Sequence, residues 1–284
     1  MSKIAIITDT DSSLPFDLAK KYSIVEVPIL IQFGEESFQD VFEINNPELF
    51  PRINREGKLP KTSAPSCGKF LEAFELAFKQ GAESILCFNI SSEMSATYAS
   101  ARQAAEMMPG KQIEVIDTRT LAMGQGYMVL AAAETVAKGG NIKKAIAEAE
   151  SVRERTTLFA SLATLKYIAM SGRVGYLAAG LAAVLDVKPI LTLGNGKLEM
   201  LEKIRTQHKS WKRTVELSAE KVGSRKIEQL AIQHVNAIDS AKEFEKMLRA
   251  ALPCPDEILI TDMTPGLSCH TGAGTVAVIC VTAK

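Results

Sequence analysis

The feature that most constrains the fold is the alternation of short apolar runs with helical patterns in the first half of the chain. Four short segments are apolar and rich in β-branched or aromatic side chains, as buried strands are: residues 4–7, 24–31, 84–89 and 113–116. Four others show helical spacing or helical composition: residues 70–78, 95–108, 126–137 and 142–153. This alternation predicts a parallel sheet with helices on both faces.

The pattern changes from about Thr156. Strands are predicted at residues 158–162, 187–193, 197–204, 226–235, 257–262 and 275–281, with helices at 211–221 and 241–251. Gly194-Asn195-Gly196 has the composition of a tight hairpin turn. A hairpin among helices and strands predicts a mixed sheet. The chain is therefore predicted to fold as two α/β domains, residues 1–157 and 158–284.

Composition removes several classes of function. The 284 residues carry 33 Lys+Arg against 33 Asp+Glu, and a net charge of +0 argues against a nucleic-acid partner. The apolar stretch 4–7 ends too soon at Asp9 for a signal peptide, and the longest apolar run, 176–185, is short of the roughly 20 residues of a membrane span. Five scattered cysteines without a CxxC pair are typical of a reducing compartment. These features predict a cytoplasmic protein.

Three hydroxyl-rich segments lie beside predicted strand ends or helix starts. They are 8–13 (TDTDSS), 61–66 (KTSAPS) and 91–97 (SSEMSAT). Helix capping, by a residue of 11–13 in the first segment and by Ser63 or Ser66 in the second, is the simplest interpretation of each one. Capping accounts for one hydroxyl per helix, however, and a helix start also attracts anions. The accumulation of three such segments predicts a site for an anion or a polar head group.

No catalytic motif is evident. The sequence lacks a GxSxG elbow and a GxxxxGK[ST] phosphate loop, and its three histidines are scattered at 208, 234 and 270. Gly124 and Gly126 supply half of a GxGxxG fingerprint, but Val129 stands at the position of the third glycine. A dinucleotide-binding or redox protein is therefore the last of the hypotheses. An enzyme that uses Asp9 and Asp11 with a divalent metal, as a hydrolase or phosphotransferase, is the main alternative to a binding protein.

Three residues near glycine-rich or strand-end positions each have two interpretations. His270 lies in a glycine-rich segment, 265–274, that is either a ligand loop or a surface turn between strands. Arg205 follows a predicted strand and is either a carboxylate partner or a surface charge. Arg173 lies between glycines and is either a docking point for a partner or a solvated charge.

Seven segments, in this order, resemble the DegV family of fatty-acid-binding proteins, which are bacterial carriers that serve a fatty acid kinase. They are TDTDS (8–12), KTSAPS (61–66), SSEMSATY (91–98), VIDTR (115–119), MSGRVG (170–175), VKPIL (187–191) and HTGAG (270–274). The resemblance covers essentially the whole chain. It implies two α/β domains with an acyl chain in a tunnel between or beneath them.

The resemblance also implies site residues and partners. The fatty acid carboxylate would be held by Thr62 and Ser95, with Ser92 as the less favoured serine, and by His270 and Arg205. The kinase would phosphorylate this carboxylate to an acyl-phosphate that feeds phospholipid synthesis. Catalytic groups, Mg²⁺ and ATP would belong to that partner, which resembles dihydroxyacetone kinases. The chain itself would then be a carrier with no cofactor, no metal and no enzymatic activity, and its contact with membranes would be at most transient.

Overall fold

The computed structural model describes residues 3–171 and 187–284 of the chain, which forms two compact units. Unit 1 comprises Met1–Glu43 and Thr62–Glu154, and unit 2 comprises Ile44–Lys61 and Arg155–Lys284. The chain thus crosses from unit 1 to unit 2 between Glu154 and Arg155, close to the predicted boundary. It also crosses from one unit to the other at each end of the segment Ile44–Lys61, and the sequence patterns did not indicate these two crossings. Both units are α/β, as predicted.

Unit 1 contains a four-stranded sheet in the order β2-β1-β6-β7. Its strands are β1 (Ile4–Asp9), β2 (Val25–Val27), β6 (Ser84–Asn89) and β7 (Gln112–Asp117). All three strand pairs are parallel, which confirms the predicted sheet type. The carboxyl ends of the four strands consequently lie at one edge of the sheet, the position where open parallel sheets bind ligands.

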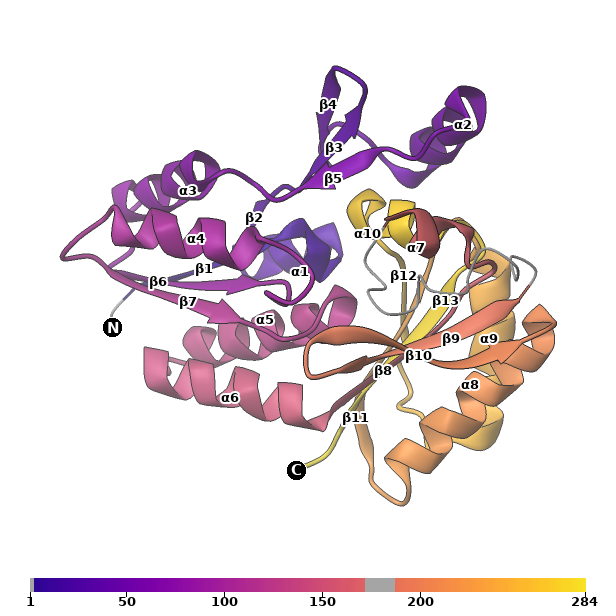
Figure 1. The fold of residues 1–284 in the computed structure, drawn as a ribbon. Helices are drawn as coiled ribbons and strands as arrows, with labels where there is room; N and C mark the ends of the chain where they lie inside the picture. Colours follow the sequence, from indigo (N-terminus) through magenta and orange to yellow (C-terminus); the bar gives the residue numbers. More distant parts are fainter. Residues whose placement is uncertain (1–2, 172–186) are drawn as a thin grey trace. The chain divides into compact units, whose positions relative to one another are not determined.

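Helices cover both faces of this sheet (Figure 1). They are α3 (Cys67–Lys79) and α4 (Thr97–Glu106) on one face, and α5 (Ala122–Ala137) and α6 (Ile142–Arg155) on the other. Phe70 and Phe74 of α3 are fully buried in the cluster that contains Ile85 of β6. A short helix, α1 (Phe16–Lys21), connects β1 to β2. The sequence therefore predicted the layers of unit 1 correctly.

The predicted strand at residues 24–31 is two strands. The chain leaves β2 at Val27, passes Pro28, and continues as β3 (Leu30–Phe33) of a separate small sheet. Proline has no amide hydrogen to donate to a strand ladder, so a break here is expected. The small sheet has the order β4-β3-β5, with β4 (Glu36–Gln39) and β5 (Lys61–Ser63).

Unit 2 contains a six-stranded sheet in the order β10-β9-β8-β13-β11-β12. Its strands are β8 (Thr156–Ser161), β9 (Lys188–Gly194), β10 (Lys197–Ile204), β11 (Ile227–His234), β12 (Leu259–Asp262) and β13 (Val276–Thr282). Only the β11–β12 pair is parallel among the described pairs, so the sheet is mixed, as predicted. The predicted hairpin joins β9 to β10, and Asn195 and Gly196 both have positive φ, as a type I′ turn requires.

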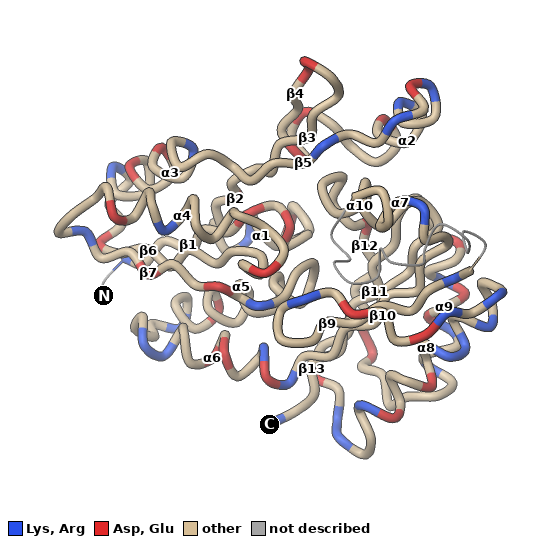
Figure 2. The backbone as a smooth tube through the Cα atoms, viewed as in Figure 1, with Lys and Arg blue, Asp and Glu red and all other residues tan. Residues whose placement is uncertain are grey.

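Helices α8 (Gln207–Val222) and α9 (Ile238–Ala251) pack against this sheet. Trp211 and Val215 of α8 and Phe244 and Leu248 of α9 are buried in one cluster with residues of β11 and β13. Acidic and basic residues are interspersed along both helices (Figure 2). Arg213, for example, forms ion pairs with glutamates at 202, 216 and 220. Within residues 3–171 and 187–284, no helix is long and apolar enough to span a membrane.

Helix α2 (Asn46–Glu56) lies within the segment that returns to unit 2. The Nδ2 atom of Asn46 donates to the carbonyl of Met263 at 2.7 Å, and Nδ2 of Asn236 donates to the carbonyl of Asn46 at 3.3 Å. Phe50 packs edge-on against Tyr167, with 6.1 Å between ring centroids. A buried amide and an aromatic contact thus attach α2 to unit 2.

We expect Asn46→Ala to lower the free energy of unfolding by about 1–2 kcal/mol, because it leaves the Met263 carbonyl without this donor. Urea denaturation at neutral pH measures the change. Asn54→Ala in the same helix is the control: Asn54 is exposed, so its replacement is expected to change stability by less than about 0.5 kcal/mol. Equal effects of the two substitutions would contradict the prediction.

Candidate functional site

Two of the three hydroxyl-rich segments lie at the carboxyl edge of the parallel sheet of unit 1. The 3₁₀ turn η1 (Thr10–Ser12) follows β1, and the loop of residues 90–96 follows β6, which pairs in parallel with β1. The third segment belongs to a different sheet. Residues 61–63 form β5 in the small sheet, and Ser66 caps α3 by accepting a hydrogen bond from the Lys69 amide at 3.3 Å. The capping interpretation is therefore right for Ser66.

The loop of residues 90–96, which we call the serine loop, is held in place by the neighbouring strand end. Both the amide and the hydroxyl of Ser92 donate to Asp117, at 3.1 and 2.5 Å. The Ser91 amide donates to the Thr120 carbonyl at 2.9 Å, and Glu93 pairs with Arg119 at 3.2 Å. Since the Ser92 proton is directed to Asp117, this hydroxyl is poorly placed to donate to a ligand.

Ser95 lies two residues before the first residue of α4. Its Oγ accepts a hydrogen bond from the Thr97 amide at 3.3 Å and lies 2.8 Å from the Thr97 hydroxyl. The N-cap residue, Ala96, offers no side-chain cap, and Thr97 is fully buried, so Ser95 provides the partly exposed hydroxyl beside this helix start. Ser95 is only partly buried. A partly exposed hydroxyl at the positive end of a helix suits a carboxylate ligand.

The other predicted ligands are distributed over both units. Thr62 lies in β5 and is partly buried, in unit 1 with Ser92 and Ser95. His270 and Arg205 belong to unit 2, so a clamp built from all of them stays a prediction. Arg173 lies outside the described residues.

The surroundings of the two unit 2 ligands differ. His270 is partly buried in α10 (Pro265–Thr271), a helix that ends at Gly272, where φ is 84°. Residues 265–271 are therefore neither a loop nor a simple glycine turn between two strands, and the ligand role of His270 stays a prediction. Arg205 follows β10 and is exposed.

Asp9 is the most buried charged group at this edge. It is 0% exposed, and its carboxylate accepts hydrogen bonds from the amides of Asp11 and Ile90 and from the side chains of Asn89 and Gln125. Burial raises the pKa of Asp9 to about 6, although these four hydrogen bonds oppose the shift. The predicted caps of the helix after Pro15 are not used, since α1 has no side-chain cap; Asp9 itself caps η1.

Asn89 and Gln125 were not singled out from the sequence, yet both line this edge. One signal was available for Gln125: it is the single side-chain amide in the long buried stretch of α5, residues 122–130. A buried polar side chain in such a run needs a hydrogen-bond partner, and Asp9 and Thr8 supply it. Asn89 ends a fully buried strand and carries a weaker signal of the same kind.

The metal-dependent alternative gains no support from this geometry. The Asp9 carboxylate would have to give up several of its four donors to bind a cation. Within residues 3–171 and 187–284, no group of three or more His, Cys, Asp and Glu side chains is arranged to hold a metal ion.

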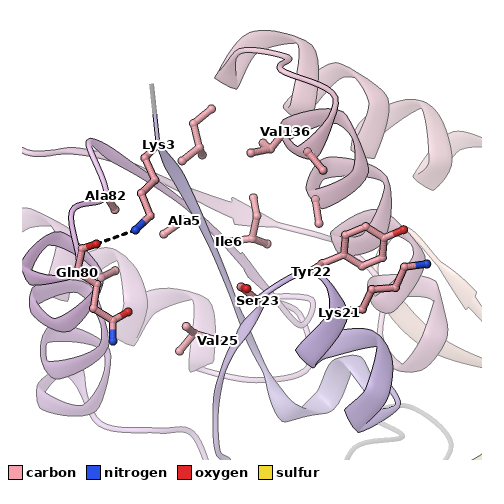
Figure 3. Close-up of a pocket in the computed structure, with 14 residues that line it drawn as sticks. Lys3, Ala5, Ile6, Lys21, Tyr22, Ser23, Val25, Gln80, Ala82 and Val136 are labelled. Carbon is pink, nitrogen blue, oxygen red and sulfur yellow. Dashed lines mark hydrogen bonds between the residues drawn. The ribbon is translucent and has the colours of Figure 1, made fainter. Parts of the chain in front are cut away.

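A cavity of about 390 Å³ lies in unit 1, at the amino ends of β1 and β2 (Figure 3). Its walls are mostly alanine and branched aliphatic side chains. Lys3 donates to the Gln80 carbonyl at 2.7 Å, and the Lys21 ammonium lies 5.1 Å from the centre of the Tyr22 ring. Lys21 lies at the carboxyl end of α1 and Lys3 contacts the carboxyl end of α3, where a positive charge interacts favourably with the helix dipole. The cavity is remote from the serine loop along β1, and none of the predicted ligands lines it.

Comparison with known proteins places the chain in a family. Residues 3–283 match the profile described as uncharacterised protein, DegV family, and the chain therefore belongs to the DegV family. A DegV domain-containing protein of Halalkalibacterium halodurans is 32% identical over 276 residues, which cover 97% of each chain. Another, from Streptomyces coelicolor, is 31% identical over 276 residues, again 97% of each chain.

Solved structures show the same fold. A DegV family protein from Thermus thermophilus, described by its fatty acid binding, superposes with a TM-score of 0.91 at 29% identity, over 99% of this chain and 100% of that one. The fatty acid binding DegV family protein SAG1342 from Streptococcus agalactiae superposes with a TM-score of 0.89 at 25% identity over the whole of both chains.

Proposed function

We propose that this protein binds a long-chain fatty acid and clamps its carboxylate with hydroxyl groups. The observation that carries the proposal is the hydrogen-bonded serine loop, which holds Ser95 at the start of α4 in a fold shared with fatty-acid-binding proteins of T. thermophilus and S. agalactiae. Thr62 is the second hydroxyl of the proposed clamp, and His270 and Arg205 are its proposed basic members.

The acyl chain and the carboxylate of a fatty acid contribute differently to binding. Each buried CH₂ group contributes roughly 0.8 kcal/mol, so the acyl chain supplies most of the affinity and the clamp supplies orientation. With a net charge of +0, the whole molecule provides no attractive field for an anion. Local donors must therefore hold the carboxylate.

The protein is further proposed to be a carrier and not an enzyme. It would present the bound carboxylate to a fatty acid kinase that resembles dihydroxyacetone kinases, and that partner would supply ATP, Mg²⁺ and the catalytic groups for acyl-phosphate formation. Arg173 is the proposed docking residue for this partner. The clamp fits such a role because hydroxyl donors bind a carboxylate without reacting with it.

Native mass spectrometry of the purified protein tests the proposal. We expect a mass that exceeds the chain by one C14–C18-type fatty acid, and we expect delipidated protein to take up one equivalent of oleate. Protein that is purified without ligand and that also ignores added oleate would contradict fatty acid binding.

The carrier role needs its own measurement. Loaded protein is mixed with a dihydroxyacetone-kinase-like fatty acid kinase, Mg²⁺ and ATP, and hydroxylamine traps any acyl-phosphate as the hydroxamate. We expect hydroxamate only when carrier, kinase and nucleotide are all present. Product formed by the kinase and free oleate at the same rate without the carrier would contradict presentation.

A further inference from the structure

The acidic segment at the end of β1 has no part in the proposed clamp, but one of its residues, Asp9, bonds to several of the surrounding elements. The Oδ1 atom of Asp9 accepts from the Asp11 amide and from Gln125 Nε2, both at 3.1 Å. Its Oδ2 atom accepts from the Ile90 amide at 2.9 Å and from Asn89 Nδ2 at 3.2 Å. One buried carboxylate thus joins η1, the end of β6 and the start of α5.

A short path of hydrogen bonds leads from Asp9 to Ser95. Asp9 holds the amide of Ile90, the first residue of the serine loop. The carbonyl of the next residue, Ser91, accepts from the amides of Met94 and Ser95, at 3.0 and 3.2 Å. Together with the Ser91–Thr120 and Ser92–Asp117 hydrogen bonds, the position of Ile90 therefore sets where Ser91 closes the turn, and this turn places the Ser95 hydroxyl.

The start of α5 is shaped to bring Gln125 to this carboxylate. Gln125 also donates to the Thr8 hydroxyl at 2.9 Å. A Cβ atom on Gly126 would lie 3.0 Å from the Ser12 carbonyl and 2.8 Å from Met123 Sδ, so a side chain at this position would crowd the close approach of α5 to η1. Because an ionised carboxylate is costly to bury without donors, the convergence of four donors on Asp9 indicates a specific arrangement.

We infer that Asp9 is a positioning residue of the ligand site: its carboxylate anchors Ile90 and thereby fixes the serine loop in the conformation that presents Ser95. The inference rests on the proposed function for its link to fatty acid affinity. The placement of the loop is independent of that link. Asp9 does not touch the ligand in this scheme, and it acts through the backbone of Ile90 and Ser91.

Asp9→Asn tests the inference because it keeps the side-chain shape and replaces one acceptor oxygen by a donor. We expect oleate affinity to fall about tenfold, the effect of losing a hydrogen bond to a charged acceptor. We also expect backbone amides of residues 90–97 to exchange with deuterium about tenfold faster in the ligand-free variant. Should Asp9→Asn not fold, Asp9→Glu serves instead, since its longer side chain cannot keep all four contacts.

Asp40→Asn is the matched control. Asp40 is also 0% exposed in unit 1, but its carboxylate accepts from the Thr10 hydroxyl at 2.7 Å, a contact with η1 and not with the serine loop. We expect this variant to lose stability while it keeps its oleate affinity and its exchange rates at residues 90–97. The midpoint of thermal unfolding is measured first for each variant. Oleate affinity and exchange rates are then compared at temperatures equally far below the two midpoints.

Two results would overturn the inference: unchanged exchange at residues 90–97 in folded Asp9→Asn, or an equal loss of oleate affinity in Asp40→Asn. If the wild-type protein does not bind oleate at all, the proposed function fails, and the exchange experiment still decides the role of Asp9. The two failures are therefore distinguishable.

Discussion

At pH 8, the Glu26→Gln variant is expected to have a free energy of unfolding about 3 kcal/mol above that of the wild-type protein. Glu26 is a partly buried residue of β2, paired with Thr8 across the ladder to β1. Burial first, and then the charges of Asp40 and Asp9, raise its pKa to about 7 from the ordinary 4.5. All three influences disfavour the ionised carboxylate, so a neutral amide of nearly the same shape removes a penalty.

The sign of the pH dependence follows from linkage. A carboxyl group whose pKa is raised on folding stabilises the folded state fully below the unfolded value of 4.5, and this contribution is lost as the pH rises through about 7. The folded and unfolded pKa values of Glu26 differ by about 2.5, and each pKa unit corresponds to about 1.36 kcal/mol. The product is the expected difference of about 3 kcal/mol at pH 8. Near pH 4 the variant and the wild type should have nearly equal stability.

Urea denaturation at pH 4, 6 and 8 measures this dependence. Glu36→Gln is the control, because Glu36 is an exposed residue of β4 and its replacement should change stability by less than about 0.5 kcal/mol at each pH. A Glu26→Gln variant that is no more stable than the wild type at pH 8, or whose advantage does not shrink as the pH falls, would contradict the prediction.

The sequence predicted the layered fold because the relevant signals are local. Phe70 and Phe74 recur at helical spacing and are both buried in α3, and the fully apolar interior of β6 reads as a strand buried on both faces. The Asn195-Gly196 turn specified its hairpin through the positive φ angles it adopts. Each of these elements is determined by residues that are neighbours in the chain.

The excursion of residues 44–61 could not be predicted in the same way. Its helix has an ordinary capping box at Asn45 and Glu48, which marks where the helix begins but not which unit it joins. That choice depends on Asn46 meeting Met263, more than 200 residues away. Contacts of this range leave no periodic pattern in the sequence.

The site shows the same division between local and distant signals. The hydroxyls of the serine loop and the TDTDSS segment were visible as a cluster beside strand ends, and the parallel pairing of β1 with β6 brings these two to one edge. The roles within the cluster were not visible. Ser92 and Ser95 look alike in sequence, and only the structure shows that Ser92 is bonded to Asp117 at the end of β7, whereas Ser95 contacts Thr97 at the start of α4.

Replacing both proposed clamp hydroxyls, in Thr62→Ala/Ser95→Ala, is expected to weaken oleate binding about 100-fold. A hydrogen bond to a charged group contributes about 1.5–3 kcal/mol, and the loss of two such bonds is partly offset by water at the head group. Each single variant should lose about tenfold. Titration of delipidated protein with oleate measures the dissociation constants, and the fold should survive because Thr62 and Ser95 are both only partly buried.

Two further serine variants distinguish hydroxyls that bind the carboxylate from hydroxyls that only stabilise the surrounding structure. Ser66→Ala removes the cap of α3, so it should cost about 1 kcal/mol of stability and leave oleate affinity unchanged. Ser92→Ala loses the contact with Asp117 and should weaken binding less than Ser95→Ala does, since the Ser92 proton is not free to reach a ligand. Oleate affinity within threefold of wild type in the double variant, or a larger loss in Ser92→Ala than in Ser95→Ala, would show that the carboxylate is held elsewhere.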